Sequence, residues 1–238
     1  MSRPFAVFDI DGTIIRWQLY HAICDSMAKA GIIDDQAFAE VRKQRMSWKT
    51  REHDQAFLEY EKSLIEVFNS ALTKTGVDNF HEIAQQVFDK YKDQVYTYTR
   101  ELIKELKGRD YILFAISGSP NIIVKEMVDY YGFDDFMATS FEVEGDRFKG
   151  YEYLVIGQKH LALDKLVKKH NLSYENSYGI GDSDGDIEML AKTSNPIAFN
   201  PNRVFFEEAK KRRWPIVIER KNMIYKLVAS DEGYKLDD

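Results

Sequence analysis

The stretch FAVFDIDGTI, residues 5–14, joins an apolar run directly to two aspartates, and it decides how the rest of the sequence is interpreted. The residues up to Ile10 are rich in strand formers and predict a buried strand. Asp9 and Asp11 lie at the end of that run, although two carboxylates so close together repel each other and lose solvation on burial. The stretch therefore predicts a site where a binding partner stabilises negative charge.

Further apolar runs resemble the first one and predict more strands, with helix-like segments between them. The predicted strands cover residues 111–117, 176–182, 195–200 and 214–219, and the predicted helices cover residues 121–131, 159–170 and 185–192. Strands that alternate with helices in this way form a parallel sheet with right-handed crossovers. The sequence thus predicts an α/β fold with a doubly wound, Rossmann-like core.

The stretch between the first strand and the rest breaks this alternation. It is rich in charged residues and contains amphipathic helical patterns over residues 55–72 and 80–92. We expect a helical insertion, and hence a core domain of residues 1–16 and 96–238 with an inserted helical domain of residues 17–95. Two smaller features are a β-hairpin over residues 141–150, turning at Gly145-Asp146, and a polar, frayed tail, SDEGYKLDD.

The overall composition excludes several classes of protein. Among the 238 residues, 44% are hydrophobic and 30% are charged, which is typical of a globular chain. The net charge of −6 argues against a nucleic-acid partner, and no apolar run is long enough to cross a bilayer. Cys24 is the single cysteine, so an intrachain disulfide is impossible. These features predict a cytoplasmic protein without nucleic-acid or membrane partners, and they leave its oligomeric state open.

Polar residues follow three of the predicted strands. Beside the two aspartates of the first strand, Ser117 follows the second, and Asp182 and Asp186 follow the third. Lys159 begins the helix before that third strand. Ligands of parallel α/β sheets bind at the carboxyl ends of the strands, so we expect these groups to converge. A cluster of carboxylates without histidine or cysteine predicts a hard cation such as Mg²⁺, which commonly partners phosphate.

Taken singly, these motifs have other interpretations. DSDGD, residues 182–186, has the alternate acids of a calcium loop, but an EF-hand needs glycine at its sixth position, where this chain has Ile187. SGSPN, residues 117–121, lacks the lysine and hydroxyl residue of a nucleotide-binding P-loop. The order of the motifs along the chain is more specific than any one of them.

DIDGT (9–13), ISGS (116–119), Lys159 and GDSDGD (181–186), in this order, resemble the motifs of the haloacid dehalogenase superfamily of phosphohydrolases. The resemblance runs from residue 5 to about residue 200. The helical insertion after the first motif is similar to the helical cap of subclass I. The segment ISGSPNIIVKEMVDYYGF, followed by a hairpin, is similar to the branch that contains the phosphoserine phosphatases.

The resemblance implies a mechanism and a set of site residues. Asp9 would be the nucleophile that forms an aspartyl-phosphate, and Asp11 would be the general acid and base. Asp9, Asp182 and the backbone carbonyl of Asp11 would bind Mg²⁺, while Asp186 would support either the metal or the lysine. The expected phosphate-binding residues are Ser117, Gly118 and Lys159.

The same resemblance predicts a phosphomonoesterase that acts on a small phosphorylated metabolite. Phosphoserine enzymes have a glutamate shortly after the first motif, where IIRWQLYHAI, residues 14–23, has Arg16 and Gln18 but no acid. They also have an arginine where this chain has Glu66, and both departures argue against phosphoserine. Arg16 near the first motif is a candidate for binding a second negative group of the substrate. Two alternatives stay open: a phosphotransferase or phosphomutase that uses the same aspartyl-phosphate, and a non-catalytic phosphate-binding protein of the same fold.

Overall fold

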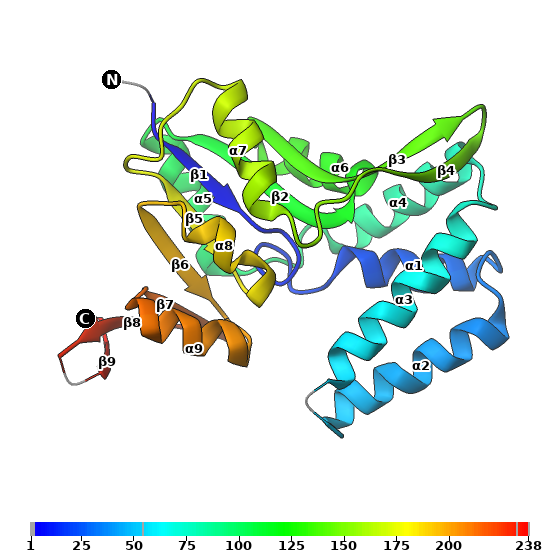
Figure 1. Cartoon of the computed structure of the whole chain (residues 1–238), viewed down its shortest axis with the longest axis horizontal. Helices are drawn as coiled ribbons and strands as arrows, with labels where there is room; N and C mark the ends of the chain where they lie inside the picture. The colour runs from blue at the N-terminus through cyan, green and yellow to red at the C-terminus, as the bar shows by residue number, and fades with distance from the viewer. Residues whose placement is uncertain (1–2, 54, 232, 238) are drawn as a thin grey trace. The chain divides into compact units, whose positions relative to one another are not determined.

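The nine strands of residues 3–53, 55–231 and 233–237, the part of the chain described by this computed structural model, form one sheet. Its strand order is β4-β3-β2-β1-β5-β6-β7-β8-β9, with β1 beside both β2 and β5 (Figure 1). The strands are β1 (Phe5–Phe8), β2 (Ile112–Pro120), β3 (Asp135–Glu144), β4 (Arg147–Tyr153), β5 (Tyr178–Gly181), β6 (Asn195–Phe199), β7 (Ile216–Arg220), β8 (Met223–Ser230) and β9 (Gly233–Leu236).

The centre of the sheet is parallel, as the sequence predicts. β1 pairs in parallel with β2 on one side and with β5 on the other, and β3, β6 and β7 continue the parallel arrangement outward. The chain order thus reverses next to β1, which makes the carboxyl end of β1 the switch point of the sheet. Open α/β sheets bind their ligands at this place.

Helices cover the sheet on both faces because side chains of a strand alternate between faces. Phe5 and Val7 of β1 share one buried cluster with side chains of α7, α8 and α9. On the opposite face, Phe8 contacts Phe133, just beyond α6, and Phe199 stacks on Tyr98 of α5. The helices are α1 (Leu19–Lys29), α2 (Asp35–Thr50), α3 (Ala56–Leu72), α4 (Val77–Tyr91), α5 (Thr97–Gly108), α6 (Asn121–Tyr131), α7 (Lys159–Lys169), the 3₁₀ helix η1 (Asp184–Asp186), α8 (Ile187–Leu190) and α9 (Arg203–Arg212).

The chain divides into two compact units. The first contains residues 1–18, 91–139 and 153–238, and the second contains residues 19–90 and 140–152. The second unit is therefore the helical insertion together with the outer part of the β3–β4 hairpin. In this unit the hairpin side chains Phe141 and Phe148 contact Phe68 and Phe80 of the helices.

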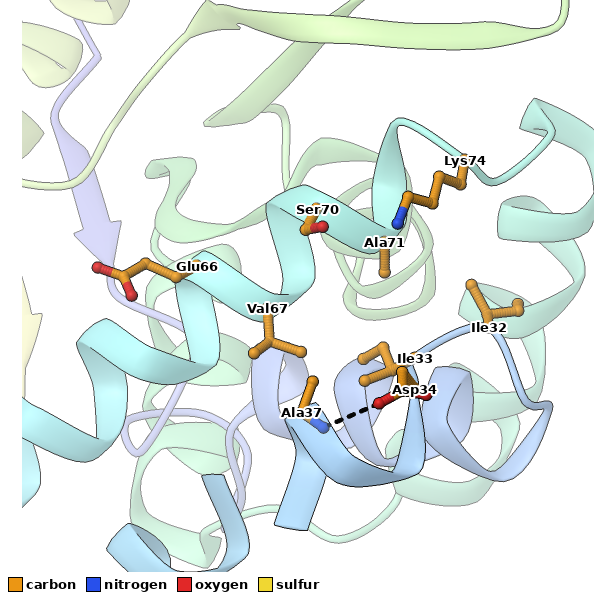
Figure 2. A pocket seen from close by; sticks show the side chains of 9 residues that line it. All are labelled: Ile32, Ile33, Asp34, Ala37, Glu66, Val67, Ser70, Ala71 and Lys74. Carbon is orange, nitrogen blue, oxygen red and sulfur yellow. Dashed lines mark hydrogen bonds between the residues drawn. The ribbon is translucent and has the colours of Figure 1, made fainter. Parts of the chain in front are cut away.

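The helical unit has a surface hollow of about 340 Å³ between α2 and α3, shown in Figure 2. Its lining is mostly apolar, and the side chain of Asp34 accepts a hydrogen bond from the amide of Ala37, 3.1 Å away, which caps α2. Glu66 of α3 lies on the rim of this hollow. The aspartates of the predicted site belong to the other unit.

The prediction of a frayed tail is wrong for those tail residues that the structure describes. Instead of fraying, the tail forms β9, which pairs antiparallel with β8, and β8 in turn pairs antiparallel with β7. The hydroxyl of Tyr234 in β9 donates to the carbonyls of Ala209 and Trp214, at 3.0 and 2.7 Å, so the last strand is held against the end of α9. The 141–150 hairpin is present as predicted, with Gly145 in the left-handed region at φ 59°.

The described residues contain no helix with the length and apolar character that crossing a membrane requires. α3, the longest amphipathic segment of the insertion, has 17 residues and buries only one face.

One buried histidine makes the helical unit sensitive to acid. His21 of α1 is 3% exposed, and its ring lies 4.9 Å from the ring of Tyr60. Burial, helped by the nearby positive charge of Arg45, lowers the pKa of His21 from 6.5 to about 3. The folded unit therefore keeps His21 neutral at pH values where the unfolded chain is protonated.

We predict that His21 costs this unit stability as the pH falls below 6.5, because only the unfolded state then binds the proton. Between pH 6.5 and pH 5 the cost is about 2 kcal/mol. Amide hydrogen exchange of α1 and α3 measures the opening free energy. His21→Phe, which keeps an aromatic ring in place, should lose correspondingly less stability over this range. Equal losses in both proteins would contradict the prediction.

Candidate active site

The first site residue lies where β1 meets the switch point of the sheet. The amide of Asp9 still donates to the carbonyl of Ile180 in β5 at 2.9 Å, so the backbone of Asp9 continues the strand pairing. Its side chain is almost fully buried, with 3% of its surface exposed. A carboxylate fixed to the end of a paired strand has little freedom to move.

Lys159, at the start of α7, holds two of the acids together. Its ammonium group donates to Oδ1 of Asp9 and to Oδ1 of Asp186, both at 2.6 Å. Burial alone would lower the pKa of Lys159, but the charges of Asp186 and Asp9 outweigh it and raise that pKa above its usual range. Lys159 therefore remains a cation in the centre of the cluster.

Asp186 is held by the backbone of its own loop. Its Oδ2 accepts hydrogen bonds from the amides of Asp182 and Ser183, at 3.1 and 3.0 Å, and from the Ser183 hydroxyl at 3.1 Å. One oxygen of Asp186 thus shapes the turn after β5, and the other faces Lys159. This turn directs Asp182 toward the end of β1.

Asp182 approaches the first motif closely. The hydroxyl of Thr13 donates to Oδ1 of Asp182 at 3.3 Å. Gly12 has φ +82°, and a Cβ at this position would lie 2.3 Å from Oδ2 of Asp182. Glycine is required here both for the backbone conformation and for the space that Asp182 occupies.

The carboxylate of Asp11 points to a different set of partners. The hydroxyls of Ser117 and Ser119 donate to its Oδ2, at 2.7 and 2.9 Å. Gly118 lies between them at the end of β2, where a Cβ would come within 2.9 Å of the Ile156 side chain. Asp11 and Asp9 therefore have separate environments although only one residue lies between them.

Desolvation dominates the electrostatics of Asp9. Burial raises its pKa from 3.8 to about 7; Lys159 opposes that change, while Asp186 and Asp11 add to it. Burial and the charges of Asp9 and Asp186 also raise the pKa of Asp182 well above its usual range. The cluster therefore holds more negative charge than its single ammonium neutralises, which favours an additional cation.

Comparison with known proteins identifies the family. The model of haloacid dehalogenase-like hydrolases matches residues 6–191, which contain every motif of the site. The chain belongs to this family of hydrolases. The resemblance inferred from the four motifs is thereby confirmed.

Curated relatives of this hydrolase include phosphatases. A histidinol-phosphatase from Neisseria meningitidis is 23% identical over 90% of this chain and 98% of its own. A phosphoserine phosphatase from Methanocaldococcus jannaschii is 25% identical over 93% of this chain and 95% of its own. A solved phosphoserine phosphatase, described as a phospho-aspartyl intermediate analogue, superposes with a TM-score of 0.64 at 23% identity. It covers 93% of this chain and 95% of its own, which confirms the α/β fold.

The hydrolase offers a donor set that fits a hard divalent cation. One carboxylate oxygen from each of Asp9, Asp182 and Asp186 lies within 4.8 Å of the others. The set contains only oxygens, which is the preference of Mg²⁺, and it carries the excess negative charge described above. The side chain of Asp11 is not in this set, so Asp11 could join it only through its backbone carbonyl, as the resemblance implies.

The sequence analysis assigned no function to some residues that contact the acids of the site or Arg16. Thr13 and Ser119 contact acids of the site, and both belong to the motifs already quoted. Arg16, the predicted substrate residue, makes an ion pair with Glu219 at the end of β7, with 2.5 Å between Nη2 and Oε1. Like the acids of the candidate site, Glu219 is a carboxylate near the carboxyl end of a strand, and this pattern in the sequence could have identified it.

We predict that Mg²⁺ stabilises this hydrolase by relieving the charge of the cluster. At a concentration about a hundred times Kd, a ligand that binds only the folded state contributes about 2.7 kcal/mol. The melting temperature should therefore rise by about 5 °C or more. Differential scanning fluorimetry with Mg²⁺ and with a chelator measures this shift.

The matched variants compare shifts rather than absolute melting temperatures, because removing a buried charge can stabilise the metal-free protein. Asp182→Asn should lose most of the shift. Asp129→Asn, on the exposed face of α6, should keep all of it. A full shift in Asp182→Asn would exclude this residue as a ligand.

Proposed function

We propose that the protein is a Mg²⁺-dependent phosphomonoesterase that hydrolyses a small phosphorylated metabolite through an aspartyl-phosphate on Asp9. The observation that carries the proposal is the buried carboxylate of Asp9, 2.6 Å from the Lys159 ammonium and grouped with Asp182 and Asp186. Phosphoric monoester hydrolysis is the reaction of the phosphatases in this family, and the chain is an enzyme of that class.

In the first step an oxygen of Asp9 attacks phosphorus and the bond to the ester oxygen breaks. Asp11 donates its proton to the departing alkoxide, which leaves as the alcohol. Lys159, with the hydroxyl of Ser117 and the amides around Gly118, binds the phosphoryl oxygens and offsets their charge. The Ser117 hydroxyl donates to Asp11 at 2.7 Å, so donation to a phosphoryl oxygen would replace that bond.

In the second step a water molecule attacks the phosphorus of the aspartyl-phosphate. Asp11, now ionised, takes a proton from this water, and the bond to Asp9 breaks to release inorganic phosphate and the free carboxylate. Asp9, Asp182 and the backbone carbonyl of Asp11 would hold Mg²⁺, whose positive charge would keep the carboxyl groups of Asp9 and Asp182 ionised. Asp186 holds Lys159 in place throughout.

We also propose a division of labour between the predicted domains. The core domain of residues 1–16 and 96–238 carries the chemistry, because every acid of the site belongs to it. The helical cap domain of residues 17–95 would select the substrate. Gln18 and Glu66 argue against phosphoserine, so the proposed substrate is another small phosphomonoester. A cytoplasmic location is proposed from the single cysteine.

Asp9→Asn tests the proposed nucleophile, since an amide of the same shape cannot form the acyl-phosphate. We expect phosphate release from a panel of small esters, including phosphoserine and histidinol phosphate, to depend on Mg²⁺ and to disappear in the variant. Asp129→Asn is the control and should retain wild-type rates. Wild-type rates in Asp9→Asn would exclude this residue as nucleophile, and no turnover of any ester by the wild type would favour a phosphate-binding protein.

Transfer and hydrolysis are separated by their products. We expect inorganic phosphate to account for all of the ester consumed, even when an acceptor alcohol such as glycerol is added, because water attacks the aspartyl-phosphate. Phosphorus NMR of the reaction mixture measures both products. Formation of a new phosphate ester at the expense of inorganic phosphate would instead identify a phosphotransferase.

A further inference from the structure

The two segments that connect the core to the helical insertion pair with each other inside the first unit. The amide of Arg16 donates to the carbonyl of Gln94 at 2.8 Å, and the amide of Tyr96 donates to the carbonyl of Ile14 at 2.9 Å. Ile15 and Val95 face each other as an antiparallel bridge between these bonds. The outgoing and the returning segments therefore move together.

Glu219 ties this pair to the sheet. It lies on β7, and only 2% of its side chain is exposed. Its Oε1 accepts from Nη2 of Arg16 at 2.5 Å and from the amide of Thr97 at 3.1 Å. Its Oε2 accepts from the amide of Tyr98 at 2.8 Å. Glu219 thus caps the start of α5 from a distance, where no side chain of the helix itself does so.

Arg16 completes the contact from the other side. Its Nε donates to the carbonyl of Val95 at 2.8 Å, and its guanidinium lies over the ring of Tyr96, 5.2 Å from the centroid. The Arg16 side chain thus binds Glu219 and the first two residues of the returning turn, Val95 and Tyr96. Breaking a hydrogen-bonded pair with one buried member leaves its partners unsatisfied, so these contacts favour a single position of the turn.

The paired segments continue directly into the loop that carries Asp11. The amide of Gly12 donates to the carbonyl of Ile15 at 3.1 Å, and the Thr99 hydroxyl in α5 donates to the carbonyl of Thr13 at 2.9 Å. Asp11 and Ile15 themselves form a bridge. The loop of residues 10–16 is therefore held from one side by its own hydrogen bonds and from the other by the segment that Glu219 anchors.

We propose that Glu219, acting through Arg16 and the turn of residues 95–98, is a positioning residue for Asp11. It fixes the loop so that the carboxyl of Asp11 reaches the leaving oxygen, a placement on which proton transfer depends steeply. The inference rests on the proposed function, in which Asp11 is the general acid. It assigns Arg16 to the anchor rather than to the substrate.

The test compares two leaving groups. An alkyl phosphate needs a proton on its departing oxygen, whereas p-nitrophenyl phosphate releases an acidic phenol without one. Glu219→Gln keeps the size of the side chain and removes its charge. We expect kcat/KM for the alkyl ester to fall about tenfold or more, and kcat/KM for p-nitrophenyl phosphate to fall less than about threefold. Because kcat/KM reports the first irreversible step, the later hydrolysis of the aspartyl-phosphate does not enter the comparison.

Matched variants separate positioning from general damage. Glu208→Gln changes a surface glutamate that also binds an arginine, Arg212, and should alter neither ester. Arg16→Met should reproduce the leaving-group dependence, and it carries the test if Glu219→Gln does not fold, since the Arg16 side chain is half exposed. Equal losses for both esters, or no loss, would overturn the proposal. If Arg16→Met instead raised only KM, and only for esters that carry a second anionic group, Arg16 would be a substrate-binding residue.

A readout independent of turnover distinguishes failure of this proposal from failure of the proposed function. Glu219→Gln should speed amide hydrogen exchange in residues 10–16 and 94–99, with α9 unchanged. Unchanged exchange in both segments would overturn the anchor even if the enzyme hydrolyses its esters. Faster exchange in a chain whose wild type hydrolyses no ester would keep the anchor and reject the phosphatase assignment.

Discussion

The site depends on the cost of burying several carboxylates beside one ammonium. Asp9, Asp182 and Asp186 bring oxygens within 4.8 Å of one another, and Lys159 is the cation that touches two of them. In a low-dielectric environment this excess charge is unfavourable, and the raised pKa of Asp9 expresses that cost. The carboxylates stay close together despite this electrostatic cost because strand ends, a tight turn and a glycine leave these side chains no alternative position. In the proposed function, bound Mg²⁺ would offset this excess negative charge.

Two acids at strand ends in this chain show how surroundings decide a carboxylate's role. Glu219 accepts hydrogen bonds from two backbone amides and from Arg16, so its oxygens are engaged and it holds the returning segment to β7. Asp9 accepts from the ammonium of Lys159 at the switch point of the sheet, which suits it to the nucleophilic role proposed above. Burial is similar in the two cases. The number of nearby hydrogen-bond donors is what separates Glu219, a structural acid, from Asp9, the proposed nucleophile.

Prediction from sequence succeeded where a local pattern alone determines an element. The helix over 121–131 ends at Gly132, which has the left-handed conformation that the pattern requires, and the apolar runs at 111–117 and 195–200 lie in β2 and β6. It failed at the tail, residues 230–238, where β9 has few buried side chains and owes its form to pairing with β8. Local composition does not reveal a neighbouring strand, so the polar residues of the tail suggested fraying.

The sequence by itself determined which residues stand at the strand ends and in what order, because hydrophobic periodicity and turn chemistry are local properties. From this order came the family and the candidates Asp9, Asp11, Ser117, Lys159, Asp182 and Asp186. Only the tertiary structure decided how they divide: Lys159 between Asp9 and Asp186, the serines on Asp11, and Arg16 on Glu219. These pairings join residues as many as 203 positions apart. Coulombic attraction and desolvation depend on distance in space, which only the assembled sheet specifies.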